Sequence, residues 1–184
     1  MDTNQAAVVL EPITRESASI LHNLFDLYAH DFSEHMPLQI KPSGRFEITP
    51  GEVWWTRDDH FPYLIKQREQ LAGFALVREG SRVTGASDVM DVAEFFVLRG
   101  MRRKGVGRRA AHALFRSFPG AWEIRVRRTN AAAIPFWSRA AETWTGQPPA
   151  SSPFSIEGVD WDVLRFIATG GDDAFVSPNP RKLQ

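Results

Sequence analysis

A basic, glycine-containing turn is the part of this chain whose residue types most clearly suggest chemistry. It reads Arg102-Arg103-Lys104-Gly105-Val106-Gly107, and it follows the apolar run 92–98 and precedes a helical pattern. Glycines let main-chain N–H groups converge without interference from Cβ atoms, and N–H groups at a helix N-terminus bind anions, typically phosphate. The chain has 22 basic and 22 acidic residues, so this positive charge is local. We predict a phosphate site here, with an ordinary basic surface turn as the alternative.

Two common glycine-rich phosphate motifs do not fit this turn. In a dinucleotide fingerprint, Ala110 would be a tolerated third position, but an acidic residue should follow about 20 residues later. The stretch 124–128 is basic instead. A P-loop requires Lys and Ser or Thr after its second glycine, whereas Arg108-Arg109 follow here. The remaining pattern is Arg-x-x-Gly-x-Gly directly after an apolar strand.

Residues 94–115, which carry this pattern, resemble the acyl-CoA-binding motif of the GNAT superfamily of N-acetyltransferases. Residues 130–137 resemble a later motif of the same family, in which Asn ends a strand and a Phe-Tyr pair lies on the next helix. Residues 61–65 and 71–77 resemble its central hairpin. Residues 28–34, with the pair Phe136-Trp137, are similar to a bacterial subgroup of predicted acetyltransferases.

The resemblance implies an α/β (α+β) GNAT fold. In that fold, helices flank a mixed, mostly antiparallel central sheet, and a splayed pair of neighbouring strands holds acyl-CoA. The implied activity is direct transfer of an acetyl group from acetyl-CoA to a primary amine, with no metal and no covalent enzyme intermediate. The acceptor is expected to be a small-molecule or peptide amine. The alternative is a GNAT-fold module that binds acyl-CoA without transferase activity.

The resemblance also implies which residues contact the cofactor. Backbone groups of the central strand would pair with the pantetheine amides, and the amides of the turn would hold the pyrophosphate. Phe136 and Trp137 on the later helix would line the thiol end, with packing in the core as the alternative. The expected cofactor-binding residues are Phe96, Val97, Leu98, Arg102, Arg103, Lys104, Gly105, Val106, Gly107, Arg108, Asn130, Phe136 and Trp137.

Acetyl transfer to an amine needs a base, an oxyanion donor and a proton for the leaving thiolate. Glu94 is the candidate base, with a solvated or salt-bridged strand residue as the alternative, and a backbone N–H near Val97 is the candidate oxyanion donor. Asn130 is the second candidate catalytic residue, and its alternative role is a helix cap. Trp137 stands where the resemblance implies a Tyr acid. Because an indole N–H is not a usable acid, the leaving-group step lacks its familiar residue.

The N-terminal region lines the acceptor site in proteins of this family. On this resemblance, Tyr28, Asp31, Glu34 and Trp55 are the candidate substrate-binding residues, and an acidic rim would suit a cationic amine. The alternatives are a solvated helix end for the acids and core packing for the tryptophan.

Apolar periodicity predicts how the strands and helices are ordered along the chain. Strands are expected at 8–13, 61–67, 71–78, 90–98, 121–127 and 161–167. Helices are expected from Thr14 to before Pro37, around 53–55, over 105–118 and from near Pro135. At 184 residues, the chain is predicted to form one domain over 1–170 with a loosely ordered tail over 171–184.

Composition excludes several other classes of function. There are no cysteines, and the five histidines form no H-x-x-x-H pair, so neither disulfides nor a metal site is expected. No apolar run approaches the roughly 20 residues of a membrane helix, and the N-terminus lacks a signal peptide. We therefore expect a cytoplasmic protein with no membrane partner. Net neutrality argues against nucleic acid as a partner, and the sequence allows a homodimer.

Overall fold

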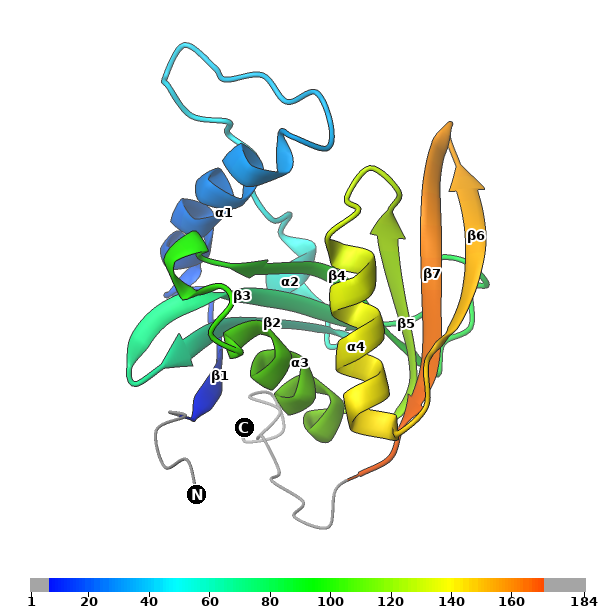
Figure 1. Ribbon diagram of the computed structural model, residues 1–184. Coiled ribbons are helices and arrows are strands. Elements are labelled where there is room, and N and C mark those ends of the chain that lie inside the picture. The colour runs from blue at the N-terminus through cyan, green and yellow to red at the C-terminus, as the bar shows by residue number, and fades with distance from the viewer. Residues whose placement is uncertain (1–6, 171–184) are drawn as a thin grey trace.

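The computed structural model describes residues 7–170, and within this range seven strands form one mixed sheet in the order β1-β2-β3-β4-β5-β7-β6 (Figure 1). The predicted tail, 171–184, lies outside the described residues. The strands are β1 (Val8–Pro12), β2 (His60–Gln67), β3 (Gln70–Glu79), β4 (Val89–Val97), β5 (Gly120–Arg127), β6 (Ala150–Ile156) and β7 (Val159–Ala168). The helices are α1 (Ala18–Phe32), α2 (Val53–Thr56), the 3-10 turn η1 (Arg99–Met101), α3 (Val106–Ser117) and α4 (Ala133–Thr145). This architecture confirms the expected α+β class.

Helices cover both faces of the sheet (Figure 1). Alternate residues of a strand point to opposite faces, so β2 supplies Tyr63 to one face and Leu64 to the other. The first face packs against α3 and α4 through a core that includes Leu114 and Trp137. The second face packs against α1 and α2 through a smaller core that includes Phe25. The sheet thereby holds α1 and α4 at fixed positions on either side of β4.

The strands β4 and β5 separate soon after they meet. They pair in parallel only through Val89–Ala121, Met90–Trp122 and Asp91–Glu123, and β5 then continues alongside β7. All other neighbouring strands are antiparallel. Beyond Asp91, the edge of β4 that faces β5 therefore has no strand partner among residues 7–170. This is the splayed pair that the sequence predicts.

The backbone of β4 directs polar groups outward along this open edge. The pairing with β3 shifts by one residue at Ala93, which marks a β-bulge. Farther along, the Leu98 N–H donates to the Ala72 oxygen at 2.8 Å. Hydrogen-bonded pairs alternate in an antiparallel ladder, so Phe95 and Val97 direct their N–H and C=O groups away from β3. In agreement, the Val97 oxygen accepts a hydrogen bond from Arg102 Nε at 2.7 Å, on the open side.

Three local predictions differ from the structure. The first helix begins at Ala18 rather than Thr14, because Thr14 and Ser17 form a turn in which the Thr14 N–H donates to Ser17 Oγ at 3.1 Å. The helix α4 begins at Ala133, after the N-cap residue Ala132, so the alternative role of Asn130 as the cap is wrong. The strand β6 was not predicted.

Candidate functional site

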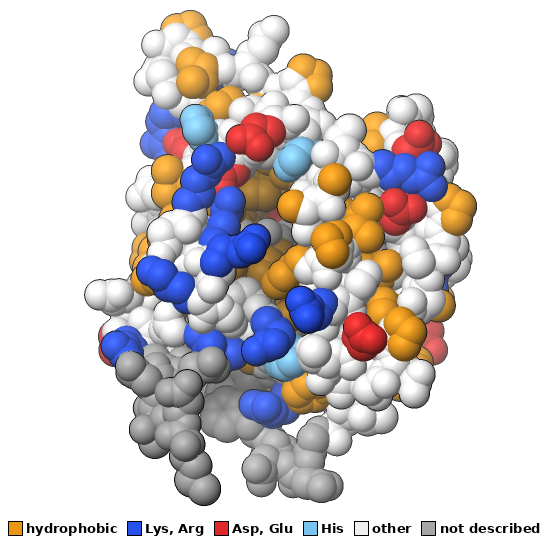
Figure 2. Space-filling model, viewed as in Figure 1, with side chains coloured by type: hydrophobic (Ala, Val, Ile, Leu, Met, Phe, Trp, Pro, Cys, Tyr) orange, Lys and Arg blue, Asp and Glu red, His pale blue; other side chains and the backbone are white. Residues whose placement is uncertain are grey.

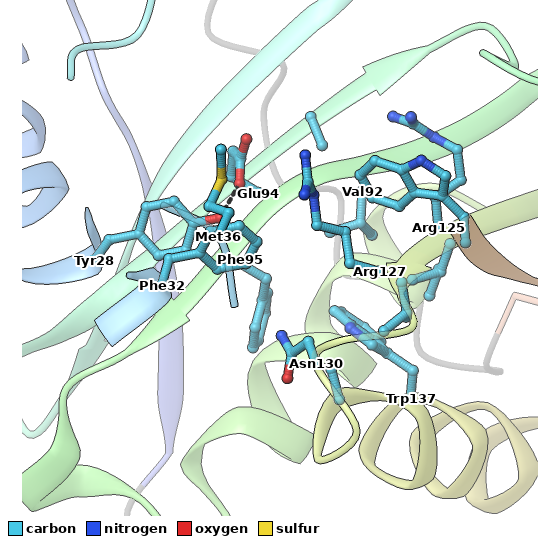
Figure 3. Close-up of a pocket in the computed structure, with 15 residues that line it drawn as sticks. Tyr28, Phe32, Met36, Val92, Glu94, Phe95, Arg125, Arg127, Asn130 and Trp137 are labelled. Atoms are coloured by element: carbon cyan, nitrogen blue, oxygen red, sulfur yellow. Dashed lines mark hydrogen bonds between the residues drawn. The ribbon is translucent and has the colours of Figure 1, made fainter. Parts of the chain in front are cut away.

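A cavity of about 260 Å³ occupies the gap between the separated strands β4 and β5 (Figure 3). The strand β4 provides one wall and β5 the opposite wall, while α1 and α4 close the two sides. The lining residues are Tyr28, Phe32, Met36, Val92, Ala93, Glu94, Phe95, Ile124, Arg125, Val126, Arg127, Asn130, Ala133, Trp137 and Trp161. Residues of α1 and α4, two elements far apart in sequence, thus line one cavity at the edge of the central strand.

Glu94 lines this cavity immediately after the bulge in β4. Its Oε2 accepts a hydrogen bond from the Tyr28 hydroxyl, which comes from α1 (Figure 3). Glu94 makes no other side-chain hydrogen bond and no ion pair among residues 7–170. The salt-bridged alternative for this residue is therefore not what the structure shows.

The surroundings shift the pKa values of both partners upward. Burial raises the pKa of Glu94 above its usual value, although the Tyr28 hydrogen bond and the charges of Arg125 and Arg78 oppose this effect. Burial likewise raises the pKa of Tyr28, and the charge and hydrogen bond of Glu94 raise it further. Tyr28 therefore remains a proton donor to Glu94. A carboxylate with a raised pKa in a cavity is a candidate proton acceptor.

The turn between β4 and α3 forms a backbone cradle. Arg103 and Gly105 both have left-handed backbone conformations, with φ values of 62° and 75°. The first intrahelical bond of α3 runs from the Arg109 N–H to the Gly105 oxygen at 3.1 Å, so the preceding N–H groups point out of the helix end. A Cβ atom on Gly107 would lie 3.2 Å from the Phe136 ring, which brings the start of α3 close against α4. Backbone donors at such a helix start favour an anion.

Arginines of this connection are tied to the end of α1. Arg99 Nε donates to Asp31 Oδ1 at 2.7 Å and its Nη2 donates to Glu34 Oε1 at 3.2 Å, while Arg102 also binds Asp31. Burial alone would raise the pKa of Asp31, but the hydrogen bonds and charges of both arginines outweigh it and hold that pKa low. Figure 2 shows Lys and Arg side chains gathered over this connection, beside a hollow with hydrophobic side chains in its floor.

Of Asn130 and the aromatic pair of α4, Phe136 and Trp137, the cavity is lined by Asn130 and Trp137. The Asn130 side chain does not cap α4, and it lines the cavity together with Trp137. Trp137 is 5% exposed and packs edge-on against Phe95 and Phe136, each with a ring-centroid distance of 4.9 Å. Phe136 lies between α3 and the cavity wall and does not itself line the cavity. These aromatic residues therefore shape one end of the site.

The candidate acceptor residues are only partly brought together. Tyr28 lines the cavity, whereas Asp31 and Glu34 are engaged with Arg99 and do not line it. Trp55 on α2 packs against the core on the α1 side of the sheet. An acceptor role for Asp31, Glu34 and Trp55 stays a prediction.

Several lining residues were not identified from the sequence. Phe32 is the last residue of α1, Met36 lies shortly after that helix, and Trp161 lies on β7. Arg125 and Arg127 alternate with apolar residues on β5, a pattern typical of a solvated strand face. Their position on the strand next to the central one was the signal that could have indicated them.

Two further classes of site are absent from residues 7–170. No group of three or more His, Cys, Asp or Glu side chains there could hold a metal ion. No helix in that part of the chain is both long and apolar enough to cross a membrane.

Comparison with solved structures finds the same fold in several acetyltransferases. An acetyltransferase from Thermus thermophilus has a TM-score of 0.66 at 13% identity, covering 89% of this chain and 98% of that chain. An aminoglycoside acetyltransferase in complex with coenzyme A and kanamycin has a TM-score of 0.65 at 12% identity, covering 88% and 95%. The spermidine N-acetyltransferase from Vibrio cholerae, in complex with CoA and spermine, has a TM-score of 0.58 at 12% identity, covering 88% and 95%.

Sequence comparison assigns the family directly. No curated protein matches the chain. The family described as "Acetyltransferase (GNAT) family" matches residues 21–141, which include most of α1, the central strand, the basic turn and most of α4. The sequence resemblance is thereby confirmed, and an acyltransferase activity follows from it. The chain belongs to the GNAT family of acetyltransferases.

Proposed function

We propose that this protein transfers an acetyl group from acetyl-CoA directly to a primary amine. The observation that carries the proposal is the separation of β4 from β5 after Asp91. It leaves a free backbone edge that leads from a cavity containing Glu94 to the N-terminus of α3. The solved neighbours that hold coenzyme A together with kanamycin or spermine support a CoA thioester and an amine as the two substrates.

The residues present fit acetyl-CoA. The outward C=O of Phe95 and N–H of Val97 suit the amides of a pantetheine arm, which would pair with β4 as a neighbouring strand does. The N–H groups at the start of α3 suit a pyrophosphate, and the absence of a side chain at Gly105 keeps the backbone accessible there. When bound, acetyl-CoA supplies an acetyl group activated as a thioester, whose thiol has a pKa of about 8.5 by analogy with cysteine.

Glu94 accepts the proton of the amine, directly or through a water molecule. An ammonium group cannot attack a carbonyl, so a base must remove a proton first. The raised pKa of Glu94 makes it a stronger base than an exposed carboxylate, and the Tyr28 hydrogen bond fixes its orientation. The N–H of Phe95, two residues before Val97, points to the open edge of β4 beside Glu94 and is the candidate donor to the developing oxyanion.

The departing thiolate takes its proton from water. Trp137 occupies the position of the expected acid, and its indole N–H holds its proton too strongly to donate it. A thiolate is a comparatively stable leaving group, so this step does not require a dedicated side chain. Asn130 and Trp137 position the thiol end of the cofactor at the cavity.

Two measurements test the proposal. Calorimetry with acetyl-CoA tests binding, and a thiol-release assay over amines, amino acids, aminoglycosides and peptides tests transfer. We expect acetyl-CoA binding and thiol release that depends on at least one amine, with the acetylated product detected by mass spectrometry. Binding without amine-dependent release would reject transfer and leave an acyl-CoA-binding module. Failure of acetyl-CoA to bind would reject the whole proposal.

A further inference from the structure

Within the described part of the chain, one arginine in the cavity has no acidic partner. Among residues 7–170, Arg127 forms no ion pair, and its guanidinium carbon lies 5.2 Å from the centre of the Trp161 ring. Other arginines nearby are paired: Arg125 reaches Asp91 Oδ2 at 3.2 Å, and Arg128 reaches Asp162 Oδ1 at 3.3 Å. Arg127 thus holds an uncompensated positive charge at the wall of a cavity.

The position of Arg127 follows from the sheet. It is directly opposite Trp161 in the β5–β7 pairing, so the indole ring supports the guanidinium plane. The side chain projects between Glu94 and Arg125 in the view of Figure 3. Arg127 and Tyr28 both line the cavity, and the charge of Arg127 opposes the upward shift in the pKa of Tyr28. Arg127 and Glu94 therefore face one cavity from opposite strands.

The charges around the cavity favour an anion over a polycation. Asp91, which is fully buried, is shared between Arg78 and Arg125. Asp91 balances one of its two arginines, and an ionised Glu94 balances the other. The charge of Arg127 therefore leaves these five side chains with a net positive charge. Asp31 and Glu34 do not offset it, because Arg99 and Arg102 engage them outside the cavity.

We propose that Arg127 binds an anionic group of the acceptor, either a carboxylate or a phosphate. The acceptor is then a small amine that carries such a group, and this inference rests on the acetyl transfer proposed above. Its amine lies at Glu94 and its anion at Arg127, across a cavity of about 260 Å³. A guanidinium presents two parallel N–H donors, which match carboxylate and phosphate oxygens.

Matched pairs of acceptors test this inference. The panel contains the twenty L-amino acids, each as free acid and as carboxamide, O-phosphoethanolamine with ethanolamine, and spermidine. We expect kcat/KM to be about 10- to 100-fold higher for the anionic member of a productive pair, as for one hydrogen-bonded charge. A preference within the amino acid and carboxamide pairs would identify a carboxylate as the anion, and a preference for O-phosphoethanolamine over ethanolamine would identify a phosphate. Arg127→Met, which keeps an unbranched stem against Trp161, should abolish the preference, whereas Arg128→Met should retain it.

Binding measurements separate this inference from the proposed transfer. Calorimetry of each panel member with the CoA complex gives affinity without turnover. Binding of anionic members that is lost in Arg127→Met, with no thiol release, would reject transfer and support the anion site. Equal kcat/KM within the pairs, a preference for spermidine, or an unchanged preference in Arg127→Met would overturn the anion site and leave transfer intact. Absence of both binding and release for every member would overturn it as well.

Discussion

The Tyr28 hydroxyl on α1 donates a hydrogen bond to Glu94 Oε2 on β4, across 66 positions of sequence. The Tyr28 ring is held by edge-on contacts with Phe25 and Phe74, at ring-centroid distances of 5.5 and 5.7 Å. The core beneath α1 therefore positions the donor, and the donor orients the carboxylate. Through this bond, helix packing on one face of the sheet fixes the orientation of a carboxylate in the gap.

Replacement of Glu94 tests its role as the base. Glu94→Gln keeps the size of the side chain and removes its basicity, so kcat should fall by about 10²-fold or more while CoA affinity is unchanged. In the wild type, kcat should fall as the pH drops through the raised pKa of Glu94, because only the deprotonated form accepts a proton. The variant should lack this acid limb. Equal turnover by both proteins across neutral pH would contradict the role, and loss of CoA binding would indicate a structural one.

Removal of the Tyr28 hydroxyl should shift the pH at which kcat begins to fall on the acid side. The Tyr28 hydrogen bond lowers the pKa of Glu94, so Tyr28→Phe should raise that pKa further and shift the acid limb to higher pH. We expect kcat at pH 7 to fall by about tenfold, on the scale of one charged hydrogen bond, and to recover as the pH rises. A loss of kcat that is the same at every pH would instead point to misfolding or to a direct role for the hydroxyl. Circular dichroism provides the folding control.

The basic turn can be tested with two glycines of similar backbone conformation. Gly105, with φ of 75°, lies at the start of α3, and Gly146, with φ of 77°, lies at the end of α4, where a Cβ would meet no atom within 4 Å. Both Gly→Asp changes should cost about 1 kcal/mol of stability from the left-handed backbone. Only Gly105→Asp also places a negative charge at the proposed pyrophosphate site, so it alone should weaken CoA binding, by about tenfold or more. Equal CoA affinities in calorimetry would reject the assignment of the turn.

Trp137 is expected to shape the site without transferring a proton. Trp137→Phe keeps an aromatic wall against Phe95 and should leave kcat within about threefold, while the smaller ring lowers the free energy of unfolding by about 1–2 kcal/mol. Trp137→Tyr should raise kcat if its hydroxyl reaches the thiolate. Steady-state kinetics and urea denaturation measure the two effects separately. A large loss of kcat in a folded Phe variant that binds CoA normally would show that the indole N–H takes part in the reaction.

The buried charges at the junction of β4 and β5 should stabilise the fold. Asp91 is fully buried and binds Arg78 and Arg125, so Asp91→Asn leaves two guanidinium groups without their carboxylate. We expect the free energy of unfolding to fall by about 3 kcal/mol. Asp162→Asn, which breaks a more exposed pair, should change it by less than about 1 kcal/mol. Similar losses in the two variants by urea denaturation would refute a special contribution from Asp91.

The central strand, turn and helix were predictable because their signals are local. Apolar periodicity predicted the strand at 90–98 and the helix at 105–118, and the structure has them at Val89–Val97 and Val106–Ser117. The strand β6 was missed because it contains Pro153 and three serines, which are typical of loops. An edge strand tolerates proline, because only one of its sides must pair. Residues 150–156 form a strand because they pair with β7, and this pairing cannot be seen in the local sequence.

The distribution of charge in the site could not be predicted from local sequence. From the sequence, Asp31 and Glu34 are expected to be unpaired acids at a helix end. Their partner Arg99 lies 68 and 65 positions away from them in the sequence. Arg127 reads as an ordinary solvated strand residue, and only the register with Trp161 reveals its place. Such contacts depend on how strands and helices are assembled, so they follow from the tertiary structure alone.

The three residue pairs that join β4 to β5 also determine how the gap responds to a ligand. The carboxylate of Asp91 is bonded to arginines of the strands on both sides, at the point where the strands diverge. We therefore expect the width of the gap to be set when the chain folds, so that a ligand would meet a backbone edge that is already extended. The conformational entropy of ordering that edge would then be lost on folding rather than on binding. The gap would therefore be preorganised for a ligand.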